Sequence, residues 1–214
     1  MTISETVSRL PNSSDLQRIC KSVALLDAVL QPEWDLRYFS FNTRWRHNKA
    51  LASMKTAEGD EYYLVFCSYG TILIGHTPHS PLARLLRHSP ASRARLNACV
   101  PDVFRDEMNE PVFETGEASV FLWNTAMAPG WGYARLPEII KEDYSEDLLF
   151  ILNGDPVTYV MWVAEYFEVD LDVEIVRAIY KHTPLTSSII ARINADAEYS
   201  RVVKEAEDIG YPVA

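Results

Sequence analysis

Hydrophobic positions in the first third of the chain change from a helical period to an alternating one. From Asp15 to Leu30, apolar residues recur every three or four positions, which predicts one amphipathic helix that Pro32 ends. After Leu36, apolar and polar residues alternate, which is typical of strands. Strands are expected around 38–42, 50–55, 62–67 and 71–74. Because their connections are too short for crossovers, they predict an antiparallel meander.

Beyond this meander the pattern becomes mostly helical. A short helix is expected at 80–87, and a strand pair at 118–123 and 132–136 is expected around a turn at Pro129-Gly130. Further helices are predicted at 146–152, 155–168, 173–181, 186–193 and 197–209. In the last of them Glu205, Glu207 and Asp208 are expected to face water.

The helix at 155–168 has the clearest start signal. Asp155 supplies a capping carboxylate, and Pro156 has a backbone angle already suited to the first helical turn. We expect the buried side of this helix to hold Val157, Val160, Met161 and Ala164.

These elements together predict an α+β fold, with an N-terminal helix on an antiparallel meander sheet followed by a C-terminal helical lobe. A length of 214 residues suits a single domain over 1–214. A soft boundary near 137–144 is expected to separate the helix and sheet (1–140) from the helical lobe (144–214).

Composition favours a globular bacterial protein of the cytoplasm. The chain is 48% hydrophobic and 23% charged, which is ordinary for a folded domain. The first residues lack the apolar region of a secretory signal, and no apolar run is long enough to cross a membrane. Three widely spaced cysteines, with no CxxC pair, argue against a disulfide framework or a zinc site.

Charge divides unevenly along the chain. Residues 1–100 hold 12 Lys/Arg and 8 Asp/Glu, a net of +4, whereas residues 101–214 hold 8 and 22, a net of −14. Two interpretations stay open: an acidic binding surface for a basic protein, or the solvated faces of amphipathic helices. The candidate partner-binding residues are Glu165, Glu168, Asp170 and Asp172, together with the aromatic residues Trp123 and Trp131.

Sequence motifs for catalysis are weak. There is no GxSxG nucleophile motif and no glycine-rich phosphate loop, so no catalytic residue and no cofactor is predicted. His76 and His79 follow the fourth strand in an HxxH spacing without an evident third ligand, so no metal site is predicted either. The alternative function is a small-molecule-binding or hydrolytic enzyme with a site near His76, His79 and the carboxylates of 110–117.

A basic stretch from Arg44 to Lys49 is the one segment suited to nucleic acid. Because the chain carries a net charge of −10, we predict no nucleic-acid binding. Pairing of these basic residues with the acidic helices of the same chain is the favoured interpretation.

Three sets of segments resemble known proteins: WDLRYFSFN at 34–42, DEYYLVF and GTILIG at 60–66 and 70–75, and GDPVTYV, HTPL and IGYP at 154–160, 182–185 and 209–212. They are similar to a family of uncharacterised bacterial cytosolic proteins, some of which resemble immunity proteins of toxin systems. The resemblance implies an interaction protein whose partner is a basic, toxin-like protein. It implies no catalytic residue.

Overall fold

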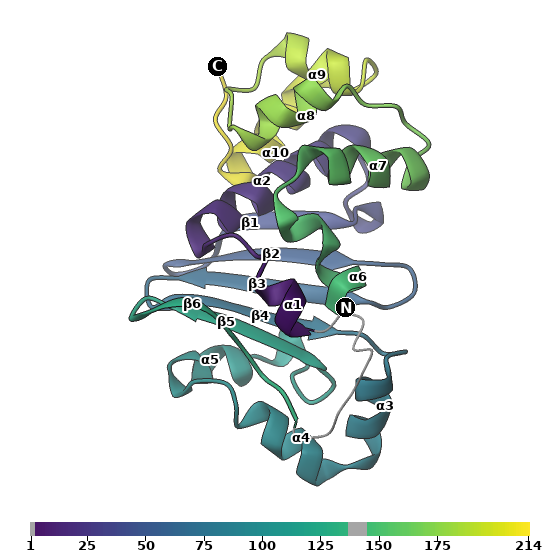
Figure 1. Cartoon of the computed structure of the whole chain (residues 1–214). Coiled ribbons are helices and arrows are strands. Elements are labelled where there is room, and N and C mark those ends of the chain that lie inside the picture. Colours follow the sequence, from purple (N-terminus) through teal and green to yellow (C-terminus); the bar gives the residue numbers. More distant parts are fainter. Residues whose placement is uncertain (1–2, 137–144) are drawn as a thin grey trace. The chain divides into compact units, whose positions relative to one another are not determined.

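The computed structural model describes residues 3–136 and 145–214 and confirms the α+β class. Helices α1 (Ile3–Val7) and α2 (Ser13–Leu30) precede the sheet, and a series of helices follows it (Figure 1). The strands are β1 (Phe39–Arg46), β2 (Lys49–Lys55), β3 (Glu61–Cys67), β4 (Gly70–His76), β5 (Val120–Thr125) and β6 (Ala128–Tyr133). Strand order in the antiparallel sheet follows chain order from β1 to β6, so the predicted meander is confirmed.

Short helices connect β4 to β5, and a longer series closes the chain. The connecting helices are α3 (Pro81–His88), α4 (Pro90–Asn97), η2 (Asp102–Phe104), α5 (Arg105–Met108) and η3 (Pro111–Phe113). The closing series is α6 (Ser145–Leu149), η4 (Phe150–Asn153), α7 (Pro156–Tyr166), α8 (Val173–Tyr180), α9 (Ser187–Ile193) and α10 (Tyr199–Ile209). One further 3-10 turn, η1 (Trp34–Leu36), precedes β1. None of the helices in the described ranges is both long and apolar enough to cross a membrane.

Contacts divide the chain into two compact units that interleave along the sequence. Unit 1 comprises residues 1–13 and 53–150, and unit 2 comprises 14–52 and 151–214. The predicted lobe boundary near 137–144 lies outside the described residues.

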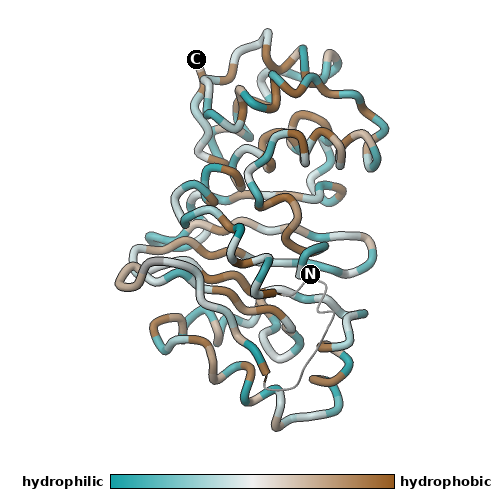
Figure 2. Tube along the Cα trace, in the orientation of Figure 1, coloured by the Kyte–Doolittle hydropathy of each residue, from teal (hydrophilic) through white to brown (hydrophobic). Residues whose placement is uncertain are grey.

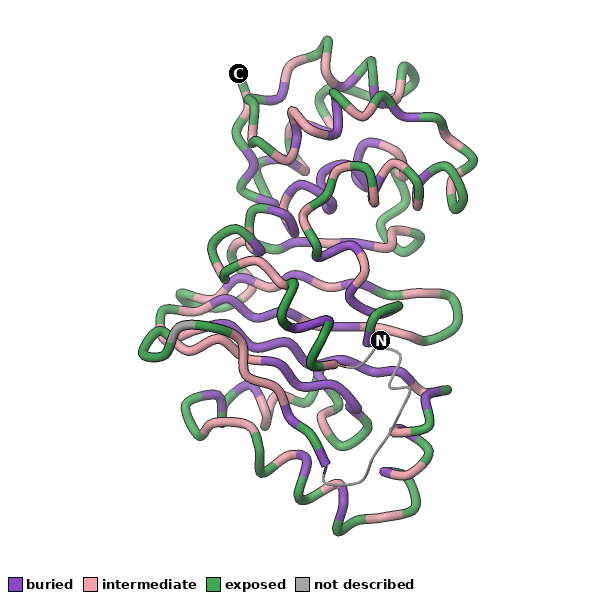
Figure 3. Tube along the Cα trace, viewed as in Figure 1, coloured by how far each residue is buried: buried purple, intermediate pink, exposed green. Residues whose placement is uncertain are grey.

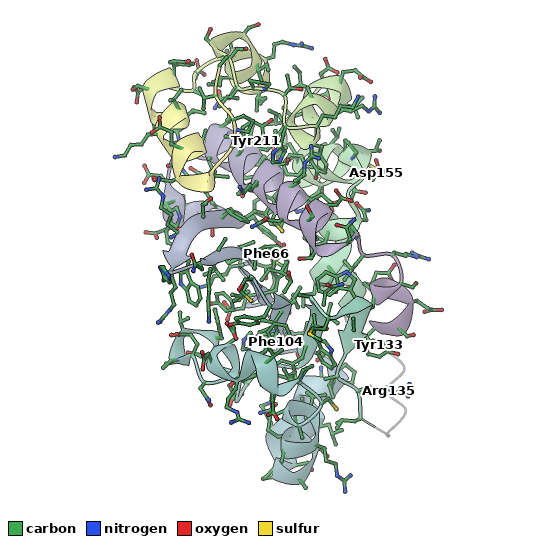
Figure 4. All side chains as sticks on the ribbon, turned by 90° about the vertical axis from the view of Figure 1, so that its left-hand side faces the viewer. Phe66, Phe104, Tyr133, Arg135, Asp155 and Tyr211 are labelled. Atoms are coloured by element: carbon green, nitrogen blue, oxygen red, sulfur yellow. The ribbon has the colours of Figure 1, made fainter. Side chains whose placement is uncertain are left out.

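Unit 1 is built around β3 to β6, with both faces of β4 covered. Leu73 pairs with Leu64 of β3 and Leu122 of β5. A Cβ atom on Gly70 would lie 3.0 Å from the ring of Phe104, and one on Gly75 would lie 2.7 Å from Leu148. Since positions five apart in a strand point to opposite faces, η2 covers one face and α6 the other. Phe104 is fully buried in this layer (Figure 4).

Unit 2 has α2 at its centre. The apolar side of α2 is buried as the sequence predicts, with Leu25, Leu26 and Val29 wholly inaccessible (Figure 3). Helix α10 packs on β1, and α7 packs on α8. Tyr211, after α10, is buried and places its hydroxyl 2.9 Å from the Thr183 carbonyl oxygen.

Two local expectations are wrong. The turn between β5 and β6 lies at residues 126–127, and Pro129 and Gly130 belong to β6, because Thr125 pairs with Ala128 across the shorter turn. Glu205 does not simply face water. Its carboxylate accepts two hydrogen bonds from Arg37, at 2.8 and 2.9 Å, and the Arg37 side chain is only 4% exposed.

Candidate functional site

Helix α7 begins as the sequence predicts. Pro156 is its first residue, and Oδ1 of Asp155 accepts a hydrogen bond of 2.9 Å from the backbone N–H of Val157. This bond satisfies one of the donors that a helix leaves open at its N-terminus. The cap residue Asp155, labelled in Figure 4, therefore defines where α7 starts.

The buried side of α7 differs from the predicted one. Tyr159 and Val163, four residues apart, are fully buried, whereas Val157 is 44% and Met161 69% exposed. Ala164 is also exposed. The sequence pattern gives no clear buried side because hydrophobic residues occur along most of α7 (Figure 2). Aromatic packing in unit 2 buries the side that carries Tyr159. An apolar stripe of α7 is left facing solvent.

Next to this stripe lies a cluster of aromatic rings. Trp162 and Tyr166 stack with their ring centres 5.2 Å apart and an angle of 11° between the rings. Tyr38, just before β1, meets Trp162 at 5.0 Å and Tyr166 at 4.7 Å, in both cases edge to face. Phe167 contacts both α7 rings. Tyr166 remains 46% exposed, so the cluster reaches the surface.

Carboxylates follow directly at the C-terminal end of α7. Glu165, Glu168 and Asp170 are all exposed. Glu168 comes just after the helix cap with φ of 56°, a left-handed backbone position that glycine usually occupies. We call these exposed residues, together with the half-buried rings of Tyr38 and Trp162, the α7 surface, and define it by Tyr38, Val157, Met161, Trp162, Glu165, Tyr166, Glu168 and Asp170.

The α7 surface lies in a strongly anionic part of the chain. From Glu142 to Val176 the sequence contains ten Asp/Glu residues and no Lys, Arg or His. The turn η1, which leads into Tyr38, adds the exposed acid Asp35 beside Trp34, which is 65% exposed. Arg37, in the same segment, is held by Glu205 and contributes little free positive charge. The surface therefore combines apolar area with a negative potential.

The predicted partner-binding residues do not form one set. Glu165, Glu168 and Asp170 belong to the α7 surface. Asp172 has a structural role instead, because it caps α8 and forms an ion pair with Arg192 at 2.6 Å. In unit 1, Trp131 donates from its indole N–H to the carbonyl of Pro11 at 2.7 Å. Trp123, also in unit 1, covers Gly132 of the neighbouring strand.

The residues of the alternative site near His76 and His79 lie in unit 1. His76 is buried, and its Nε2–H donates to the carbonyl of Phe113 at 3.0 Å. His79 is exposed, as are Glu114 and Glu117. Within the described part of the chain, no three His, Cys, Asp or Glu residues gather closely enough to hold a metal ion. The arrangement ties the loop before β5 to the end of β4.

Sequence reasoning missed the aromatic cluster of the α7 surface. A usable signal was present, because Tyr159, Trp162 and Tyr166 recur at intervals of three and four residues and so share one side of a helix. The contribution of Tyr38 carried no comparable signal, since it comes from a segment more than a hundred residues away.

Comparison with known proteins identifies no family for this chain. No family model, no curated protein and no solved structure matches this chain.

Proposed function

We propose that this chain is an interaction protein that binds a basic protein partner through the α7 surface. The observation that carries the proposal is the exposed apolar stripe of α7 set against carboxylates, with Met161 69% and Tyr166 46% exposed. Large apolar side chains gathered at a surface and edged by charge are typical of protein-binding sites. Aromatic anchors commonly supply most of the binding energy there.

The charges of the α7 surface select the partner's chemistry. Glu165, Glu168 and Asp170 attract Lys and Arg, and the faces of the Trp162 and Tyr166 rings can accept a guanidinium group. We infer a partner segment with apolar residues between arginines or lysines. Long-range attraction would speed the encounter and weaken as salt is added.

The resemblance to immunity proteins supports a narrower form of the proposal. An immunity protein of the bacterial cytoplasm would bind a toxin, and a basic toxin would complement the −10 net charge of this chain. The toxin-like partner remains part of the proposal, and the α7 surface is where we expect it to bind.

The test begins with covalent capture. A photo-reactive benzophenone side chain at Met161 should cross-link the partner in cells of the source organism. The same group at Tyr199 on α10, which is also 46% exposed, serves as the matched control. The captured protein is then purified, and its binding to the unmodified chain is measured.

Matched charge variants then decide whether the α7 surface is the site. Neutralising Glu165, Glu168 and Asp170 (E165Q, E168Q, D170N) should slow association with the captured protein about tenfold or more and flatten its salt dependence. Neutralising three exposed acids elsewhere in unit 2 (D196N, E207Q, D208N) should leave association nearly unchanged. Equal effects of the two triple variants, or a captured protein without basic character, would reject the proposal.

A further inference from the structure

A buried carboxylate joins the elements that carry the α7 surface. Asp27 of α2 is fully inaccessible to solvent. Its Oδ2 accepts hydrogen bonds of 2.8 Å from the backbone N–H groups of Tyr38 and Phe39, and its Oδ1 accepts one of 3.3 Å from the hydroxyl of Tyr159. One side chain thus connects α2, the start of β1 and α7.

Two of the residues that Asp27 contacts, Tyr38 and Tyr159, also contact the rings of the aromatic cluster. Tyr38, whose backbone Asp27 holds, places its ring against Trp162 and Tyr166. Tyr159, whose hydroxyl reaches Asp27, lies on α7 one turn before Trp162, with 5.6 Å between ring centres. A change in the contacts of Asp27 would therefore alter the packing of the aromatic rings of the α7 surface.

The groups around Asp27 stabilise its negative charge incompletely. Arg37 is the cation that acts on it, but that guanidinium is engaged by Glu205 and by the carbonyls of Gln31 and Pro32. Tyr159 faces Asp27 from α7, and burial together with the charges of Asp27 and Tyr180 raises the pKa of its phenol, so it stays a neutral donor. Cys20, near Tyr180, is also neutral because burial raises the pKa of its thiol.

Burial changes the pKa of Asp27 more than these hydrogen-bond donors do. Removal from water raises the pKa of Asp27 from 3.8 to about 7, and the hydrogen bonds from Phe39, Tyr38 and Tyr159 offset only part of that shift. The packed arrangement consequently binds a proton more tightly than any arrangement in which water reaches the carboxylate. As pH rises from about 4 through about 7, linkage favours the hydrated arrangement.

We propose that Asp27 is a positioning residue that makes assembly of the α7 surface depend on pH. Protonated Asp27 keeps α7 and the segment before β1 packed together, and ionised Asp27 favours an arrangement in which water enters and the rings of Tyr38, Trp162 and Tyr166 loosen. The consequence for binding rests on the proposed function: docking of the partner is strongest on the acid side of neutrality.

The first test needs no partner. The full chain is labelled with 5-fluorotryptophan, the Trp162 resonance is assigned with Trp162→Phe, and fluorine spectra are recorded from about pH 5 to about pH 9. We expect the Trp162 resonance to titrate with a midpoint of about 7 and the resonance of Trp131, which lies in unit 1, to stay constant through that range. A Trp162 resonance that does not titrate would overturn the proposal.

Two variants separate Asp27 from other titrating groups. Asp27→Asn should abolish the Trp162 titration and hold the resonance at its acid-side position. Tyr159→Phe, which removes one donor to the ionised form, should move the midpoint upward. The second variant keeps the test decisive if Asp27→Asn does not fold. An unchanged titration in either folded variant would count against Asp27.

Binding measurements distinguish this inference from the proposed function. If only the protonated form docks, the apparent Kd for the captured partner should rise about tenfold between pH 6 and pH 8, and Asp27→Asn should remove that rise. A fluorine titration without binding at the α7 surface would reject only the proposed function. Binding at the α7 surface without either pH dependence would reject only the role of Asp27.

Discussion

At the scale of single residues, the carboxylates of unit 2 have different roles despite similar chemistry. Asp155 and Asp172 cap helices, Glu205 holds Arg37, and Asp27 is buried under aromatic rings. Glu165 and others of the α7 surface are exposed and available to a partner. Acidity alone therefore does not identify a binding residue, and hydrogen-bond partners must be known for each carboxylate.

The cap of α7 gives a prediction for one residue. Asp155→Ala should lower the free energy of unfolding by about 1 kcal/mol, because the Val157 N–H would lose its acceptor. Asp155→Ser, which retains a capping oxygen, should restore most of the loss. Urea denaturation of the three proteins measures both effects, and equal stability of the alanine variant and the parent would show that the cap is dispensable.

At the scale of elements, the aromatic residues of the β5–β6 pair have a packing role. Trp123 of β5 is paired with Gly132 of β6, and its indole lies over the position that a side chain at Gly132 would need. Trp131 anchors the segment before α2 through Pro11. These contacts give both tryptophans a packing role within unit 1.

The fit between Trp123 and Gly132 can be tested directly. A Cβ atom at Gly132 would lie 2.3 Å from the indole nitrogen, so Gly132→Ala should force the ring to move and cost about 1–3 kcal/mol of stability. Gly116→Ala is the matched control, because nothing lies within 4 Å of the added atom. Denaturation curves that coincide for the two variants would contradict the tight fit.

At the scale of the whole molecule, the charge asymmetry of the sequence does not coincide with the folded units. The halves of the chain carry +4 and −14, but unit 1 holds 9 Lys/Arg and 15 Asp/Glu, and unit 2 holds 11 and 15. The units thus carry −6 and −4. Arg44, Arg46 and Lys49 of the β1–β2 hairpin belong to unit 2, the same unit as the α7 surface.

Negative charge on both units leads to a prediction about nucleic acids. We expect no binding of duplex DNA or single-stranded RNA at physiological ionic strength, about 0.15 M, because phosphates are repelled by the net charge of each unit. Fluorescence anisotropy with labelled oligonucleotides checks this. Binding that disappears in the double variant R44Q, R46Q would instead assign an anion-binding role to the β1–β2 hairpin.

Most element types and the fold class follow from local patterns in the sequence. Helix α2, the β1–β4 meander and the start of α7 follow from apolar period, proline positions and a capping aspartate. These signals operate over a few neighbouring residues, so they can be read without knowledge of distant contacts. Short connections then leave antiparallel pairing as the consistent topology.

Contacts between distant segments determine which side of α7 is buried and which carboxylates are exposed. Both sides of α7 are apolar enough to pack, and the buried side is the one that carries Tyr159, which packs on Trp162 and donates a hydrogen bond to Asp27, 132 residues away in the chain. The ring of Tyr38 reaches Tyr166 across a comparable separation. Such contacts form only when distant segments meet, because burial and hydrogen bonding act through space. The hydrophobic period of one segment does not specify which other segment will pack against it.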